Sequence, residues 1–245
     1  MTTKSSESSV RTLERGLEIL LAFEYSSSDF SLTELAQKVN LSPSTASRLL
    51  ASLEKYHFVR RSPETRRYSL GFAFLHLSGM AQLGNDLRAL ALPFLKKLQQ
   101  THNESASLYV VESESRVCLE RVESTHPLRR NIMIGETLPL TRGAGGRVLL
   151  AWLSKEEQKE ILAKQAGTSL EVLEGVRKAG YAVSHSEREA GVFAVSAPIF
   201  NDKKRVVAAL SMSGPTSRLT RELEIKYIKS VCQTAKQLSK ELGYS

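Results

Sequence analysis

The chain has 245 residues, long enough for two domains, and its hydrophobic fraction of 41% and charged fraction of 24% are those of an ordinary globular protein. A formal net charge of +8 favours encounter with a polyanionic partner. No apolar run approaches the roughly 20 residues that a membrane helix needs, and Cys118 and Cys232 lack the spacing of a metal motif. We expect a cytoplasmic protein that contacts no membrane, holds no cofactor or metal and keeps both thiols reduced.

The first segments of the chain predict a tail and two short helices. Residues 1–9, "MTTKSSESS", lack the apolar stretch of a signal peptide and are expected to be a disordered tail. Residues 10–24 repeat leucine at helical spacing, which indicates a first helix. A second helix should begin at Ser31, because Glu34 three residues later completes a capping box.

The third helix should begin after Ser42, with Pro43 at its first position, and run to about residue 56. An apolar stripe on one side is typical of a buried face. The opposite side offers hydroxyl and basic side chains, which suit contacts with phosphates and base edges. These candidate DNA-binding residues are Ser42, Ser44, Thr45, Ser47, Arg48 and Lys55.

Two short strand-like runs around the polar turn "PETR" follow, and together they predict a hairpin. Residues 48–67 contain six Lys or Arg against two Glu, so the positive charge is local. Three helices and a basic hairpin, over residues 10–71, are the order of a winged helix-turn-helix, whose third helix enters the major groove. The alternative is a helical bundle with an incidental hairpin. The candidate backbone contacts in the hairpin are Arg60, Arg61, Arg66 and Arg67.

A linker helix is predicted over residues 72–90, and its apolar side is a candidate for self-association. Pro93 should end one helix or begin the next. From there to residue 245 the spacing of apolar residues is in some segments that of strands and in others that of helices. We therefore expect an α+β domain whose antiparallel sheet is covered by helices. The expected strands lie at residues 105–113, 115–124, 129–135, 181–187, 193–200 and 205–214.

The stretch "PLTRGAGGRVLLAWL", residues 139–153, places a glycine-rich turn before a helix. Free backbone N–H groups at such a turn favour an anion. The spacing does not fit the phosphate loop of nucleotide-binding enzymes, which also requires a lysine and a hydroxyl. The alternative is a tight turn that needs small residues for packing.

The order and separation of several fragments make this chain resemble the IclR family of bacterial transcriptional regulators. The fragments are "LTELAQKVNLSPSTASRLLASLEKYHFVRR", "RRYSLG", "LPLTRGAGGRVLLAWL", "GYAVSHSEREAGVFAVSAPIF", "AALSMSGP" and "SKELGY". The resemblance runs from Val10 to Tyr244 and implies a winged helix-turn-helix joined to a GAF-like effector-binding domain, here residues 91–245. It also implies homodimers or homotetramers that control small catabolic or stress operons, commonly as repressors, in response to a metabolite.

The resemblance also implies an effector pocket. Its loop positions correspond to Ala144 and Gly145, and the serines of "SxSGP" correspond to Ser211 and Ser213. The family often has an acidic residue where this chain has Ser184 or His185. It often has a cysteine where this chain has Ala194, so the effectors of better-matching relatives should not be transferred.

His185 with Glu187 and Glu189 admits a metal site as an alternative to a surface histidine. An enzyme that metabolises a small molecule is the main rival function, but the serines do not stand in a nucleophile motif and the acidic residues are dispersed along helices. A non-specific nucleic-acid binder is a second rival. We expect a regulator of double-stranded operator DNA whose affinity is modulated by a small organic acid.

Overall fold

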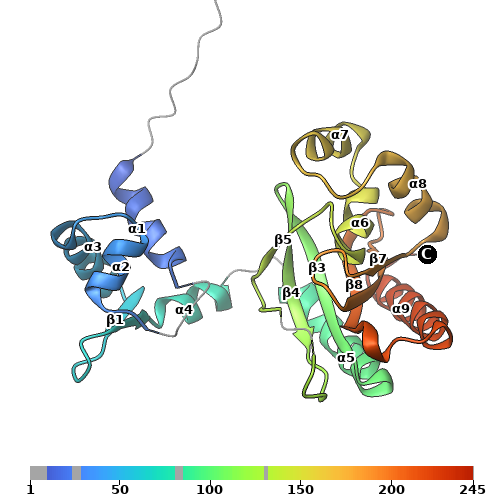
Figure 1. Cartoon of the computed structure of the whole chain (residues 1–245), viewed down its shortest axis with the longest axis horizontal. Coiled ribbons are helices and arrows are strands. Elements are labelled where there is room, and N and C mark those ends of the chain that lie inside the picture. Colours follow the sequence, from blue (N-terminus) through green and yellow to red (C-terminus); the bar gives the residue numbers. More distant parts are fainter. Residues whose placement is uncertain (1–9, 24–28, 81–84, 130–131, 245) are drawn as a thin grey trace, which may run out of the picture. The chain divides into compact units, whose positions relative to one another are not determined.

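The structure, a computed structural model, describes residues 10–23, 29–80, 85–129 and 132–244 (Figure 1). Two compact units divide the chain, residues 1–82 and residues 83–245. The expected tail, residues 1–9, lies outside the described residues.

Ahead of the linker region, the described residues of the first unit form three helices and a two-stranded antiparallel hairpin. The Ser31 hydroxyl accepts a hydrogen bond from the Glu34 N–H at 3.3 Å, and the Glu34 carboxylate accepts one from the Ser31 N–H at 2.7 Å. This capping box confirms the predicted start of the second helix. The elements are α1 (Arg11–Leu21), α2 (Leu32–Lys38), α3 (Pro43–Lys55), β1 (Val59–Arg61) and β2 (Tyr68–Leu70).

The leucine-rich first helix shows two apolar sides. Ile19 is fully buried in a core formed with Phe30, Leu35, Leu50, Val59 and Tyr68. Leu13 is 61% exposed and Leu17 and Leu21 are exposed as well. Within this unit the core therefore uses only one of the two apolar sides of α1.

The linker region contains α4 (Ala73–Met80) and the start of α5 (Asn85–His102), and residues 81–84 between them lie outside the described residues. The expectation that Pro93 ends or begins a helix is wrong, because Pro93 lies inside α5. Pro93 is exposed, so the carbonyl that loses its amide partner lies on the solvent side, where water can satisfy it.

The second unit is built on a six-stranded sheet in the order β5-β4-β3-β8-β7-β6, and every pairing is antiparallel. The strand expected at residues 129–135 is wrong for the part that the structure describes: residues 130–131 lie outside the described residues, residues 129 and 132–135 form no strand, and the third strand follows them. Gly135 has a φ of +88°, which turns the chain before that strand begins. The strands are β3 (Ser105–Glu112), β4 (Ser115–Val122), β5 (Thr137–Pro139), β6 (Ala182–His185), β7 (Val192–Phe200) and β8 (Val206–Pro215).

Helices cover both faces of this sheet. Helix α5 and the last helix, α9 (Arg221–Glu241), form one core with Leu108, Phe193 and Leu210. The opposite core joins the sheet to α6 (Ala144–Ala151), α7 (Lys155–Lys164) and α8 (Leu170–Ala179), as Figure 1 shows. A short 3-10 helix, η1 (Thr216–Arg218), connects β8 to α9. No helix in the described parts of the chain is long and apolar enough to cross a membrane.

Candidate nucleic-acid interface and ligand pocket

The start of α3 carries a fixed group of hydroxyls. The Ser42 hydroxyl accepts from the Thr45 N–H at 3.3 Å and lies 3.1 Å from the Ser44 hydroxyl and 2.9 Å from the Thr45 hydroxyl. Ser47, Arg48 and Lys55 follow along the helix. All six predicted residues lie on its outer side and only Thr45 is half-buried, whereas Ala46 and Leu50 face the core.

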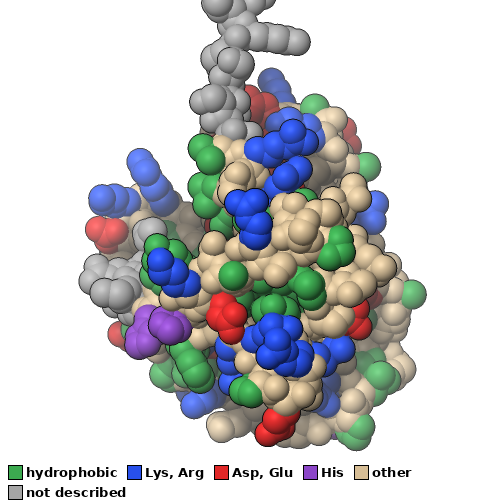
Figure 2. Space-filling view, turned by 90° about the vertical axis from the view of Figure 1, so that its left-hand side faces the viewer, with side chains coloured by type: hydrophobic (Ala, Val, Ile, Leu, Met, Phe, Trp, Pro, Cys, Tyr) green, Lys and Arg blue, Asp and Glu red, His purple; other side chains and the backbone are tan. Residues whose placement is uncertain are grey.

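Two of the four predicted hairpin arginines, Arg60 and Arg66, are exposed, and Arg61 is half-buried. Arg60 donates to the Ser69 hydroxyl at 2.9 Å, and Arg61 donates to the Arg66 carbonyl at 3.2 Å. Arg66 is exposed in the turn, with a φ of +58°. Figure 2, which faces the side of the molecule where Figure 1 shows α3 and β1, shows Lys and Arg side chains in several groups.

Arg67 differs from the other three because its guanidinium is used inside the unit. Its Nε lies 2.7 Å from the Asp29 carboxylate and its Nη2 lies 2.9 Å from the Glu34 carboxylate. The pKa of Glu34 is lowered, first by the N–H and hydroxyl of Ser31 and then by Arg67. Arg67 therefore ties the hairpin to the start of α2, a role that sequence reasoning missed.

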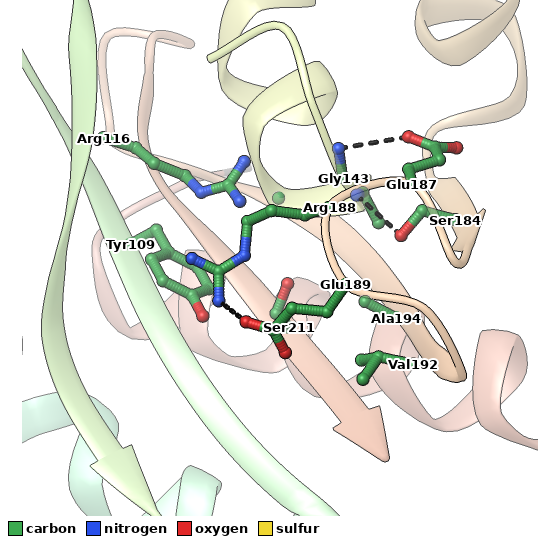
Figure 3. Close-up of a pocket in the computed structure, with 12 residues that line it drawn as sticks. Tyr109, Arg116, Gly143, Ser184, Glu187, Arg188, Glu189, Val192, Ala194 and Ser211 are labelled. Carbon is green, nitrogen blue, oxygen red and sulfur yellow. Dashed lines mark hydrogen bonds and ion pairs between the residues drawn. The ribbon is translucent and has the colours of Figure 1, made fainter. Parts of the chain in front are cut away.

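A small pocket lies in the second unit between the start of α6, the strands β3, β4, β7 and β8, and the turn between β6 and β7 (Figure 3). Five of the predicted effector-binding residues line it, namely Ala144, Gly145, Ser184, Ala194 and Ser211. The other lining residues, which sequence reasoning did not assign to the pocket, are Tyr109, Arg116, Gly143, Glu187, Arg188, Glu189 and Val192.

The glycines at the start of α6 are required by close packing. A Cβ on Gly145 would lie 3.1 Å from both the Ser211 hydroxyl and the Tyr109 ring. A Cβ on Gly146 would lie 2.1 Å from the Arg116 guanidinium. The turn therefore has a packing role, and this packing also places the helix start against Ser211 and Arg116.

The first amides of α6 are bonded to the chain itself. The Ala144 N–H donates to the Ser184 hydroxyl, and the Gly143 N–H donates to the Glu187 carboxylate, each at 3.1 Å. The same carboxylate group pairs with Arg147 at 2.6 Å. A carboxylate thus already occupies the positive end of the helix dipole, where the sequence predicted a ligand.

Two predicted residues do not line the pocket. Neighbouring residues of a strand point to opposite faces of the sheet. The side chain of His185 therefore lies on the other face from that of Ser184, where it contacts the Glu224 carboxylate of α9 at 2.5 Å. Ser213 is buried one residue pair further along β8 than Ser211, opposite Ala194. In the described ranges no group of three His, Cys, Asp or Glu side chains is placed to hold a metal ion.

The missed residue Arg116 is 2% exposed and has the largest fully buried side chain among the residues that the structure describes. Its Nη1 donates to the Arg142 carbonyl at 2.8 Å, and its guanidinium lies 5.2 Å from the centre of the Tyr109 ring. Arg188 enters the pocket from the other side and pairs with Glu136 at 3.3 Å and with Glu189. The pocket therefore contains two cationic groups beside hydroxyl donors.

Comparison with known proteins identifies the family. The profile described as "Bacterial transcriptional regulator IclR C-terminal" matches residues 81–240, and the "IclR helix-turn-helix domain" matches residues 12–63. The chain belongs to the IclR family. It is 30% identical to the transcriptional repressor IclR of Escherichia coli K12 over 256 residues, which cover 98% of this chain and 93% of that protein.

Solved structures of the IclR family share this fold. The Thermotoga maritima IclR is 28% identical with a TM-score of 0.79, over 96% of this chain and 100% of that one. An IclR homolog from Microbacterium hydrocarbonoxydans, complexed with 4-hydroxybenzoate, has a TM-score of 0.84 at 23% identity, over 96% of this chain and 100% of that one. At that identity the likeness concerns the fold alone.

These comparisons confirm the predicted family and fold class, an N-terminal helix-turn-helix and a C-terminal α+β domain with an antiparallel sheet. The protein is a transcriptional regulator with a helix-turn-helix DNA-binding domain and is not an enzyme. The alternative of a small-molecule-metabolising enzyme is therefore excluded.

Proposed function

We propose that this IclR-family regulator is a repressor of a catabolic operon and that a small organic acid, bound in the pocket of Figure 3, changes its affinity for operator DNA. The observation that carries the proposal is the buried guanidinium of Arg116, 5.2 Å from the centre of the Tyr109 ring, in a pocket that Ser211 also lines. Cationic and hydroxyl donors in a water-poor site bind a carboxylate more strongly than they would at the surface.

Operator recognition is assigned to α3 and the hairpin. The exposed side of α3 carries Ser44, Ser47 and Arg48 next to the fixed hydroxyls of Ser42 and Thr45. Short side chains let a recognition helix approach base edges closely, and arginine suits bidentate contacts with guanine or phosphate. Arg60, Arg61 and Arg66 would meet the sugar-phosphate backbone, whereas Arg67 supports the hairpin from within.

Self-association is proposed from exposed apolar side chains in the first unit. Leu13, Leu17 and Leu21 of α1 are exposed, as are Phe72, Leu75 and Leu77 at the start of the linker region. Leu13, Leu17 and Leu21 are four residues apart, so they lie on one side of α1, and a grouped apolar surface marks an interaction site more often than an isolated residue does. Two copies in a homodimer, or four in a homotetramer, would present paired third helices to successive major grooves of a pseudo-palindromic operator.

One titration series tests the proposal. The full chain is titrated against fluorescently labelled DNA from upstream of its own operon and against random DNA, with and without each member of a panel of small acids that includes 4-hydroxybenzoate. We expect the native DNA to bind at least about a thousandfold more tightly than random DNA, and one acid to change only the specific affinity. Equal affinities would favour the non-specific binder, and indifference to every acid would remove the effector role.

A further inference from the structure

The pocket is nearly filled by the chain's own side chains. Its free volume is about 20 Å³, room for roughly one water molecule and too little for a small organic acid. Arg188 and Glu189, from the turn between β6 and β7, enter the space beside Tyr109 and Ser211, as Figure 3 shows. A ligand of the proposed kind therefore has to displace something that is already there.

Glu189 is the group that resembles the ligand. Its carboxylate forms an ion pair with the Arg188 guanidinium, and Figure 3 shows this pair between the Tyr109 ring and Ser211. Arg188 has a second carboxylate partner, Glu136, at 3.3 Å. The Glu189 side chain is 41% exposed while that of Arg188 is 19% exposed. Rotation toward solvent is thus open to Glu189, and Arg188 keeps a partner in the protein.

The turn is held at the backbone around this pair. Ser186 donates its N–H to the Val192 carbonyl at 2.8 Å, and Gly191 donates to the Ser186 hydroxyl at 3.0 Å. Glu187 is fixed by Arg147 and by the Gly143 N–H at the start of α6. Displacing the Glu189 side chain therefore requires no unfolding of the β6–β7 hairpin.

We propose that Glu189 is a built-in competitor: its carboxylate occupies the position of the effector's acid group beside Arg188 and Ser211, and the effector binds by replacing it. This inference rests on the proposed function, because it concerns regulation of the same site. The charges of the lining groups define the ligand class. Two cationic side chains, Arg116 and Arg188, and two carboxylates, Glu187 and Glu189, line the pocket. Replacing the Glu189 carboxylate by a ligand keeps the net charge of the pocket unchanged only when the ligand carries a single negative charge. A second charge would be left uncompensated in a partly buried site.

The test uses acetate, the fragment that Glu189→Ala removes, and its neutral isostere acetamide. Binding is measured by calorimetry on the full chain, on Glu189→Ala, on Glu189→Gln and on the control Glu114→Ala. Glu114 is a matched control because it is also paired with a cation, Lys164, and its side chain is 45% exposed. We expect acetate to bind Glu189→Ala at least about tenfold more tightly than wild type, the scale of a charge-assisted contact, and Glu189→Gln to show an intermediate gain. Acetamide and Glu114→Ala should show none.

Equal acetate affinity in wild type and Glu189→Ala, or an equal gain in Glu114→Ala, would overturn the inference. A parallel titration with operator DNA separates it from the proposed function. If acetate binds Glu189→Ala more tightly while no acid changes operator affinity in any variant, the internal competitor stands and the effector role fails. If acids change operator affinity in wild type but Glu189→Ala gains no acetate affinity, the effector role stands and the competitor fails.

Discussion

Glu104 and Arg218 are 114 positions apart in the sequence and form a bidentate ion pair in the second unit. The Arg218 Nε and Nη2 atoms each lie 2.8 Å from a carboxylate oxygen of Glu104. The Glu104 side chain is 3% exposed, and the Arg218 Nη1 also donates to the Leu128 carbonyl at 2.9 Å. This pair joins the residue before β3 to the 3-10 helix after β8, and the hydrogen bonds that Arg218 donates to Glu104 raise the pKa of Arg218.

Arg218→Ala should destabilise the protein by about 3 kcal/mol, because removing one member of a buried pair leaves the other charge without compensation. Urea unfolding of the full chain measures the loss. The control is Arg129→Ala, whose pair with Glu123 lies at the surface and should be worth less than about 1 kcal/mol. Adding Glu104→Gln to Arg218→Ala should recover part of the stability. A loss no larger than that of the control would contradict this assignment.

Arg48→Ala should weaken operator binding by about 1–3 kcal/mol, the scale of one good base or phosphate contact. Arg48 is exposed on the outer side of α3, so the substitution should leave the fold intact, as circular dichroism can verify. Arg205→Ala, an exposed arginine in the second unit, is the matched control. Unchanged affinity in Arg48→Ala would remove this residue from the interface.

Arg66→Ala and Arg67→Ala should fail in different assays. Arg66 is exposed in the hairpin turn. Its loss should make the plot of log operator affinity against log salt concentration less steep by about one unit of slope. Arg67 bridges Asp29 and Glu34, so its loss should lower the thermal midpoint of the first unit. Identical behaviour of the two variants in both measurements would show that Arg67 is not the structural tie described above.

Ser211→Ala combined with Ser213→Ala should leave operator affinity unchanged and blunt the response to the effector. Ser211 lines the pocket and Ser213 lies one residue pair further along the same face of β8. Each single variant separates their contributions, and we expect Ser211→Ala to have the larger effect. The readout is the acid concentration that half-changes operator affinity. A normal response in the double variant would mean that the pocket is wrongly placed.

Stability should fall as the pH drops below about 6.5, because burial and the nearby charge of Lys226 lower the pKa of His102 from its usual 6.5. The unfolded state then binds the proton more readily than the folded state, so the stabilisation is complete above the unfolded pKa and is lost as the pH falls through the folded one. The imidazole packs edge-on against Tyr227, 5.1 Å between ring centres.

Urea unfolding between pH 7.5 and pH 5 measures this dependence. His102→Phe should flatten the slope in this window while keeping the aromatic contact, and Lys226→Ala should reduce it. An unchanged slope in His102→Phe would assign the pH dependence to another group.

Local signals were sufficient for most helix boundaries. The hydroxyl of Ser31 with Glu34, the same arrangement at Ser154 and Glu157, and the left-handed Gly180 after α8 all involve residues within one turn of each other. Caps of this kind are set by neighbouring residues and can be predicted from sequence. The glycine turn before α6 belongs to the same class.

The pocket residues that were missed depend on contacts between distant segments. Strand β4 alternates Arg116, Cys118 and Glu120 with Val117 and Leu119, a pattern typical of a strand that buries its apolar side chains. Instead Arg116, Cys118 and Glu120 are buried, because helices cover both faces of the sheet and the polar groups find partners there. Arg88 pairs with Glu120 and the Arg142 carbonyl accepts from Arg116. No pattern in the sequence around β4 predicts those partners.

The pairing of β3 with β8 also fixes the order in which the helix-turn-helix unit and the pocket can form during synthesis. Strand β8 completes the centre of the sheet, with Ser105 opposite Ser213, so the pocket cannot form until the last part of the chain has left the ribosome. The helix-turn-helix unit uses only residues 1–82 and is made first. A chain cut short before β8 would therefore retain the residues of the helix-turn-helix unit and lack the strand that completes the pocket.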